Sequence, residues 1–83
     1  MYEVLWLQGA VDELFELAAR DIRQARRTLT TVRSFGRDGR GDLKKLHAKD
    51  SEWRLRAGDW RVFLVLEGSR TYITRVDNRR DAY

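Results

Sequence analysis

Three arginines stand at alternating positions around a short turn in the second half of the sequence. Arg54 and Arg56 are separated by one residue, and Arg61 follows the turn. Side chains two residues apart on a strand share a face, so these arginines could form one cationic surface, together with Arg79 or Arg80 near the C-terminus. Cations held on rigid strands can stabilise negative charge that develops on a phosphate. Alternatively, they are solvated charges that prevent edge-to-edge sheet pairing.

Other kinds of chemical site are poorly supported by the residue types. The chain has no cysteine and a single histidine, His47, so neither a disulfide framework nor a metal site is expected. Segment 36–41 contains three glycines, but no Gly-Lys-Ser or Gly-Lys-Thr follows it and it does not join a strand to a helix, as a P-loop does. We therefore interpret 36–41 as a loop and expect no cofactor.

The charge of the chain is unevenly distributed. All 17 Lys and Arg residues lie at or after Arg20, whereas the residues before it carry acidic charges alone, on Glu3, Asp12, Glu13 and Glu16. Because the total is +4, the rest of the chain carries +8. Such a field concentrates polyanions or an acidic protein segment near the surface. The alternative is the solvated surface of a protein from an arginine-rich proteome.

The length and apolar content predict one folded domain over residues 1–83. Apolar residues make up 42% of the chain, which excludes disorder, but a domain of this size buries only about 60% of its unfolded surface. A bound partner would therefore stabilise it. The first residues have neither the basic region nor the long apolar run of a signal peptide or a membrane span. We expect a cytoplasmic protein that does not contact a membrane.

Hydrophobic periodicity predicts a strand and two helices in the first half of the chain. Residues 2–7 are rich in strand-forming types, and we expect them to be buried on both faces or paired in the middle of a sheet. Helical spacing begins at Ala10 and ends near Ala19. Asp21 can cap a second helix with an apolar stripe that reaches Val32. Short connections between the helices indicate an α-hairpin.

After the loop the hydrophobic period changes to two, which predicts a β-meander. Strands are expected over 53–57, 60–66 and 71–76, joined by turns at 58–59 and 67–70. The coarse order is β-α-α-β-β-β, and we expect an α+β fold in which the α-hairpin packs on one face of a mostly antiparallel sheet. By alternation we place all the tryptophans in the core, although an exposed ring could instead stack on a base: Trp6, Trp53 and Trp60.

Three segments together resemble the RelE/ParE toxin pattern, which runs roughly LKKL, YRLRVGDYRV and RVGHRREVY. The matching segments are Asp42-Leu-Lys-Lys-Leu-His47, Glu52-Trp-Arg-Leu-Arg-Ala-Gly-Asp-Trp-Arg-Val62 and Arg75-Val-Asp-Asn-Arg-Arg-Asp-Ala-Tyr83. The N-terminal strand and α-hairpin also match in order and length, so the resemblance covers essentially the whole chain. It implies a type II toxin that pairs with an antitoxin, through an acidic or amphipathic segment lying over the basic sheet face.

The resemblance also implies roles for individual residues. RelE-like members cleave mRNA on the ribosome without a metal, and the positions that match their catalytic residues are Arg54, Arg61, Arg79 and Tyr83. In that family the arginines stabilise the phosphate, and the tyrosine positions the nucleophile or acts as a base. Further basic residues match positions that contact RNA: Lys44, Lys45, Arg56 and Arg80. Which of Arg79 and Arg80 faces the site stays open.

Two departures from the pattern keep other functions open. Asn78 stands where many relatives carry a histidine, and asparagine neither takes nor gives a proton near neutral pH; Glu52 stands where some carry a lysine. We expect a ribosome-dependent mRNA endonuclease, with the ribosome and mRNA as partners besides the antitoxin, and operator DNA contacted only through the antitoxin. The alternatives are a ParE-like inhibitor that binds DNA gyrase without nuclease activity, and a degenerate toxin retained for antitoxin binding.

Overall fold

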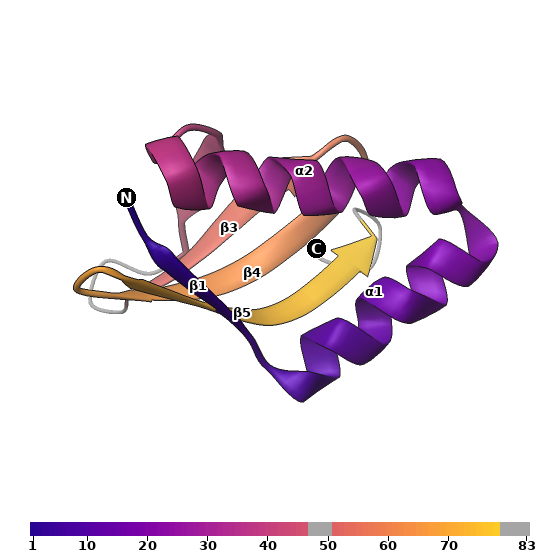
Figure 1. The fold of residues 1–83 in the computed structure, drawn as a ribbon, viewed down its shortest axis with the longest axis horizontal. Helices are drawn as coiled ribbons and strands as arrows, with labels where there is room; N and C mark the ends of the chain where they lie inside the picture. Colours follow the sequence, from indigo (N-terminus) through magenta and orange to yellow (C-terminus); the bar gives the residue numbers. More distant parts are fainter. Residues whose placement is uncertain (47–50, 79–83) are drawn as a thin grey trace.

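Helices and strands follow the order β-α-α-β-β-β-β in the computed structural model, which describes residues 1–46 and 51–78 (Figure 1). The elements are β1 (Glu3–Trp6), α1 (Gln8–Arg20), α2 (Ile22–Asp38), β2 (Asp42–Lys45), β3 (Glu52–Ala57), β4 (Trp60–Glu67) and β5 (Arg70–Asn78). The predicted α+β fold is confirmed. β2 is an additional strand that the sequence analysis did not predict.

The strands form one mixed sheet in the order β1-β5-β4-β3-β2. β1 runs parallel to β5, and the other neighbouring strands are antiparallel. β1 therefore lies at an edge, and the expectation that it is buried on both faces or paired in mid-sheet is wrong. Its apolar composition has another cause, because Val4 and Trp6 pack against the core from one face.

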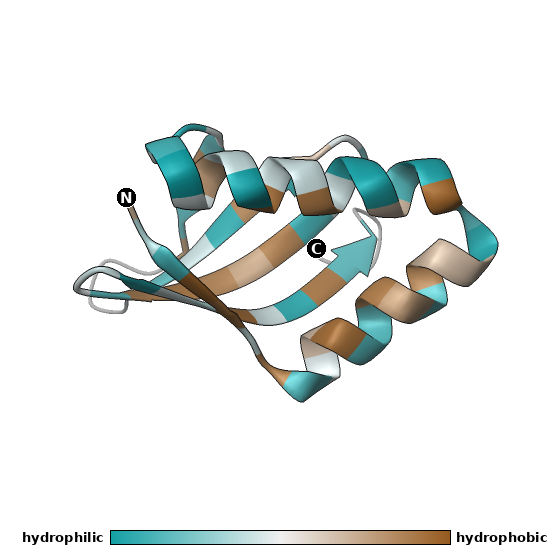
Figure 2. Ribbon diagram, viewed as in Figure 1, coloured by the Kyte–Doolittle hydropathy of each residue, from teal (hydrophilic) through white to brown (hydrophobic). Residues whose placement is uncertain are grey.

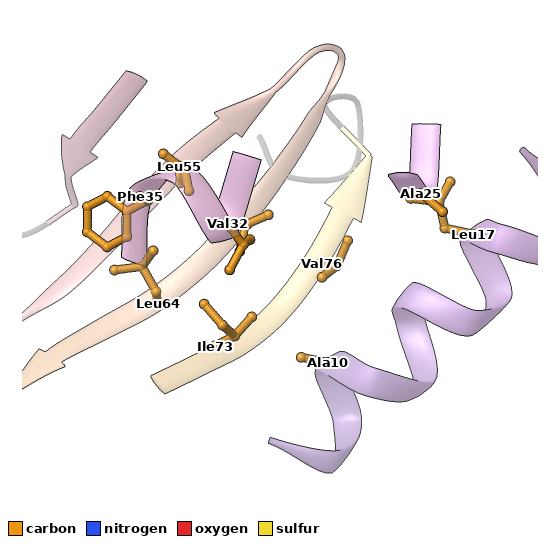
Figure 3. Close-up of a cluster of buried hydrophobic side chains, with 10 residues drawn as sticks. Ala10, Leu17, Ala25, Val32, Phe35, Leu55, Leu64, Ile73 and Val76 are labelled. Atoms are coloured by element: carbon orange, nitrogen blue, oxygen red, sulfur yellow. The ribbon is translucent and has the colours of Figure 1, made fainter. Parts of the chain in front are cut away.

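The two helices form a second layer on one face of the sheet (Figure 1). α1 packs against β5, and α2 packs against β3, β4 and β1. Apolar residues run along β4 in the middle of the sheet, as Figure 2 shows. Between the layers lies the buried core (Figure 3). The tryptophans, which we expected in the core, are partly buried and pack against it. The core consists of Ala10, Leu17, Ala25, Val32, Phe35, Leu55, Val62, Leu64, Ile73 and Val76.

The second helix begins as predicted but ends later. The Asp21 carboxylate accepts the Gln24 N–H at 3.1 Å, so it caps the first turn of α2. The helix then continues to Asp38 and ends at Gly39, which has a φ of +71°. The expectation of a loop from residue 36 onward is therefore wrong for 36–38.

Gly36 serves packing rather than a turn. A Cβ atom at this position would lie 2.6 Å from Cγ2 of Val4, and the Gly36 carbonyl accepts the Tyr2 N–H at 2.7 Å. Only glycine allows the backbone of α2 to come this close to β1. The glycine therefore fixes the edge strand beneath the end of the helix.

Candidate anion-binding site

The β3–β4 hairpin places arginines on the sheet face that the helices leave open. Leu55 and Val62 lie opposite each other on the two strands and are fully buried in the core between sheet and helices. Their neighbours along each strand point the other way. Arg54, Arg56 and Arg61 therefore share the open face, as the two-residue alternation predicts.

Like charges meet directly across neighbouring strands on this face. Arg56 is paired with Arg61 between β3 and β4, and Lys44 is paired with Arg54 between β2 and β3. Directly opposed like charges destabilise a sheet. This arrangement therefore lowers the stability of the free chain. Proteins commonly accept such unfavourable local arrangements at binding sites.

These four cations line a shallow pocket together with one acidic residue. The lining consists of Asp42, Lys44, Arg54, Arg56 and Arg61, and we call it the cationic pocket. Its volume of about 160 Å³ is roughly ten times the 10–15 Å³ that a cavity needs to hold one water molecule. A phosphate-sized anion therefore fits among side chains that are held on three neighbouring strands.

The turn between β3 and β4 orients two of the arginines. Gly58 has a φ of +67°, which favours glycine, and its carbonyl accepts hydrogen bonds from Nε of Arg56 at 3.1 Å and Nη1 of Arg61 at 3.4 Å. The turn is also tied to α2, because Nε2 of Gln24 donates to the Ala57 carbonyl at 2.8 Å. The guanidinium groups are thus anchored to a turn that the helix layer holds in place.

Arg61 is the most buried residue of the cationic pocket. It is 4% exposed, and its Nη1 also donates to the Trp60 carbonyl at 3.3 Å. A charge held in such a place must be hydrogen-bonded to be tolerated. A buried, anchored cation needs little reorganisation when it meets an anion, which is the condition for effective charge stabilisation.

A second group of side chains lies beside the cationic pocket on the open face. Phe63 is opposite Arg54 on one side and Arg75 on the other. The Arg75 guanidinium carbon lies 4.1 Å from the Phe63 ring centroid, and Nε of Arg75 forms an ion pair with Asp77. No motif in the sequence indicated this group. Counting two residues on from Arg61 would have placed Phe63 on the open face.

Several predicted residues lie away from the cationic pocket. Lys45 is opposite Trp53, with Nζ 5.6 Å from its ring centroid, and so lies on the helix-side face, unlike Lys44. Asn78 is opposite Trp60 and lines a different hollow, near α1. Glu52 is opposite Val65, two residues before Arg54 on the open face. The adjacent lysines thus separate onto two faces because strand side chains alternate.

Other predicted residues fall outside the described part of the chain: His47, Arg79, Arg80 and Tyr83. Within 1–46 and 51–78, no group of three or more His, Cys, Asp and Glu residues is placed to hold a metal ion. In the same ranges, no helix has the length and apolar character needed to cross a membrane.

No family model matches this sequence, and no curated protein matches it. The structure does match solved toxins. It is similar to the RelB-RelE antitoxin–toxin complex from Methanococcus jannaschii, with a TM-score of 0.76 and 18% identity, over 95% of this chain and 94% of that one. It is also similar to the archaeal RelE-RelB complex from Pyrococcus horikoshii OT3, with a TM-score of 0.71 and 24% identity, over 94% of each chain.

A third similar structure is the YoeB/ParE toxin from Agrobacterium tumefaciens, with a TM-score of 0.75 and 17% identity, over 94% of this chain and 98% of that one. These matches extend over nearly the full length of both partners. This chain therefore has the same fold as these RelE and YoeB/ParE structures, as its sequence motifs predict.

Proposed function

We propose that this chain is the toxin of a type II toxin–antitoxin pair, and that it acts in the cytoplasm as a metal-independent, ribosome-dependent mRNA endonuclease that inhibits translation. The cationic pocket is the observation that supports this most. Its opposed like-charge pairs, Arg56 with Arg61 and Lys44 with Arg54, are unfavourable in an isolated sheet and become favourable when an anion lies between them. A scissile phosphodiester is such an anion.

In the proposed reaction the RNA supplies its own nucleophile. The 2′-oxygen attacks the adjacent phosphorus, the bond from phosphorus to the 5′-oxygen breaks, and a 2′,3′-cyclic phosphate remains. The proton of the 2′-hydroxyl passes to water during attack, and the departing 5′-oxygen takes a proton from water. Between these events the phosphorane carries extra negative charge, which fixed cations stabilise.

The arginines have graded roles in this proposal. Arg61 is buried and anchored, so it holds the phosphate oxygens in a fixed position. Arg54 and Arg56 lie on the neighbouring strand and neutralise the charge that develops. Arg79 and Arg80 would add further cations, and Tyr83 would position the nucleophile. Removing one preorganised donor of this kind typically lowers the rate by about 10²–10³.

The proposed antitoxin has two surfaces to cover. An acidic segment complements the cationic pocket. An amphipathic helix fits the apolar groove between α1 and α2, which is lined by Leu14, Phe15, Ala18, Ile22, Ala25, Arg26 and Leu29. Phe15 is 69% exposed and Ile22 is 51% exposed. Exposed apolar patches of this kind mark protein contacts. The solved complexes with RelB show that antitoxin binding occurs in proteins of this fold.

The first experiment is to map mRNA 5′ ends by primer extension after brief induction of the chain without its antitoxin. New ends within translated codons are expected, and they should be lost in Arg61→Ala and reduced in Arg56→Gln. Because Arg61 is buried, circular dichroism of the purified variants must show that they fold. Arg40→Gln removes a charge from an exposed loop and is the matched control. Cleavage by folded Arg61→Ala at the wild-type rate would contradict the assignment.

A gyrase inhibitor is the second candidate function. Within the described residues, the lining of the cationic pocket consists of four cations and one carboxylate, Asp42, and Asn78 lines a hollow on the other face. A surface of cations without a proton-transfer pair suits binding as well as catalysis. Growth arrest with intact mRNA and inhibited DNA supercoiling would favour this candidate, and the absence of any arrest would favour a degenerate toxin.

A further inference from the structure

The Arg75 guanidinium lies over an aromatic ring on the open face of the sheet. Its Cζ atom is 4.1 Å from the Phe63 ring centroid, and its Nε is paired with Asp77. The ring below is 5% exposed, whereas the Arg75 side chain is 50% exposed. The Arg75 side chain therefore contacts the ring and is still half exposed to solvent.

A planar cation with an open face can accept a nucleobase. Arginine stacks on flat π-systems through its delocalised guanidinium, which the compact ammonium of lysine cannot do. Proteins that bind single-stranded RNA use such planes for stacking because every base has a π-face. The ion pair with Asp77 and the contact with Phe63 hold the Arg75 guanidinium in place before any ligand arrives, which lowers the entropy lost on stacking.

The position of Arg75 relative to the cationic pocket suits one nucleotide. Arg61 is opposite Asp77 between β4 and β5, and Arg75 lies two residues before Asp77 on β5. Such diagonal positions are roughly 7–8 Å apart. A phosphate bound at Arg61 could therefore place a base of the same or the adjacent nucleotide over Arg75.

We propose that Arg75, supported by Phe63, is a base-stacking platform that binds the nucleotide next to the phosphate in the cationic pocket. The platform selects single-stranded RNA as the ligand, because both faces of a base inside a duplex are already stacked on neighbouring bases. It tolerates any base and favours purines, which present the larger ring. This inference rests on the proposed function, since it takes the cationic pocket as the phosphate site.

The test uses a short single-stranded RNA that contains 2-aminopurine, whose fluorescence is quenched by stacking. Its riboses carry 2′-O-methyl groups, so it cannot be cleaved. Binding is measured by anisotropy at low salt, together with the fluorescence of the 2-aminopurine. Arg75→Lys keeps the charge and removes the planar group. Arg70→Lys, on the same strand, is the matched control because Arg70 is ion-paired with Glu3 at the far end of β5.

Arg75→Lys is expected to weaken binding at least about five-fold, the low end of what one base stack contributes, and to remove the quenching. Arg70→Lys should bind like the wild type. With an RNA that is abasic at the test position, the wild type and Arg75→Lys should bind equally. Equal binding of both to the base-containing RNA, or unchanged quenching in Arg75→Lys, would overturn the platform.

Failure of the platform is distinguishable from failure of the proposed function. If the cationic pocket binds phosphate, Arg56→Gln should weaken binding of the base-containing and the abasic RNA alike. That result together with no effect of Arg75→Lys rejects the platform and keeps the phosphate site. If the wild-type protein shows no salt-dependent binding to either RNA, both the platform and the phosphate site are rejected. A cationic pocket that binds phosphate must at least bind RNA electrostatically at low salt.

Discussion

Neutralising one arginine of the opposed Arg56–Arg61 pair should make the free protein more stable. Nε of Arg56 lies 3.1 Å from the Gly58 carbonyl oxygen, and Nη1 of Arg61 lies 3.4 Å from the same atom. The two nitrogens are therefore at most about 6.5 Å apart, the sum of those distances. Arg56→Gln removes one charge and keeps a polar side chain at an exposed position.

Coulomb's law sets the size of the effect. Two unit charges about 6.5 Å apart repel by about 0.6 kcal/mol in water and by about 2.5 kcal/mol at an effective dielectric constant of about 20. Arg56 is exposed, so solvent screening keeps the gain near the lower value. The loss of its attraction to the exposed Asp42 offsets part of the gain. We expect a net gain of about 0.3–0.6 kcal/mol at low salt, which raises the Tm by about 1–5 °C.

Thermal unfolding followed by circular dichroism at low salt and in about 1 M salt measures this difference. Arg40→Gln is the control, because it lowers the net charge equally at an exposed loop position. The gain in Tm of Arg56→Gln over Arg40→Gln should disappear at high salt, where the Debye length falls to about 3 Å. Equal stability of the two variants at low salt, or a gain that does not depend on salt, would refute the reasoning.

Two further substitutions test the structures that hold the sheet. Gly58→Ala should destabilise the chain by roughly 1–2 kcal/mol or more, because its φ is +67° and polar side-chain atoms lie within 3.4 Å of the new Cβ. Gly68→Ala, with a φ of +60° and an open surrounding, should show the backbone cost alone in urea unfolding. Glu13→Ala should cost about 1–3 kcal/mol, since the carboxylate accepts the part-buried Val76 N–H at 2.8 Å. Faster hydrogen exchange at Val76, absent in the exposed control Asp12→Ala, would check this.

Local periodicity was sufficient for most elements but could not identify close packing between distant segments. Gly36 looked like the start of a glycine-rich loop because its neighbours include Gly39 and Gly41. The structure places it inside α2, where the absence of a Cβ admits Val4. The packing of a helix against a strand far away in the sequence leaves no periodic signal, so the helix end was predicted too early.

The missed strand shows a second limit. β2 comprises Asp42–Lys45, and its alternation is too short to be recognised. Its pairing with β3 decides that Lys44 lies on the open face and Lys45 over Trp53. A resemblance to a motif gave both lysines the same role, whereas the geometry of the strand separates them.

Those parts of the candidate site that depend on a single strand could be predicted from the sequence. A period of two places Arg54 and Arg56 on one face without any structure. The register between strands could not be derived in this way, because an irregularity between Phe63 and Leu64 shifts the pairing of β4 with β5. That shift leaves Arg75 opposite Phe63, and a bulge of this kind re-aims side chains near binding sites.

The opposed arginines also bear on how an antitoxin could inhibit the proposed nuclease. RNA and an acidic antitoxin segment are both polyanions, so under the proposed function both would bind Arg54, Arg56 and Arg61, and each would relieve the same repulsion. If both ligands use the same cations, as we propose, occupation of the pocket by the antitoxin would be sufficient to exclude RNA, and no change of shape would be required. Each ligand stabilises the folded chain in proportion to its binding. Arg56→Gln should therefore weaken both ligands while it stabilises the free protein, a combination that a purely structural arginine would not produce.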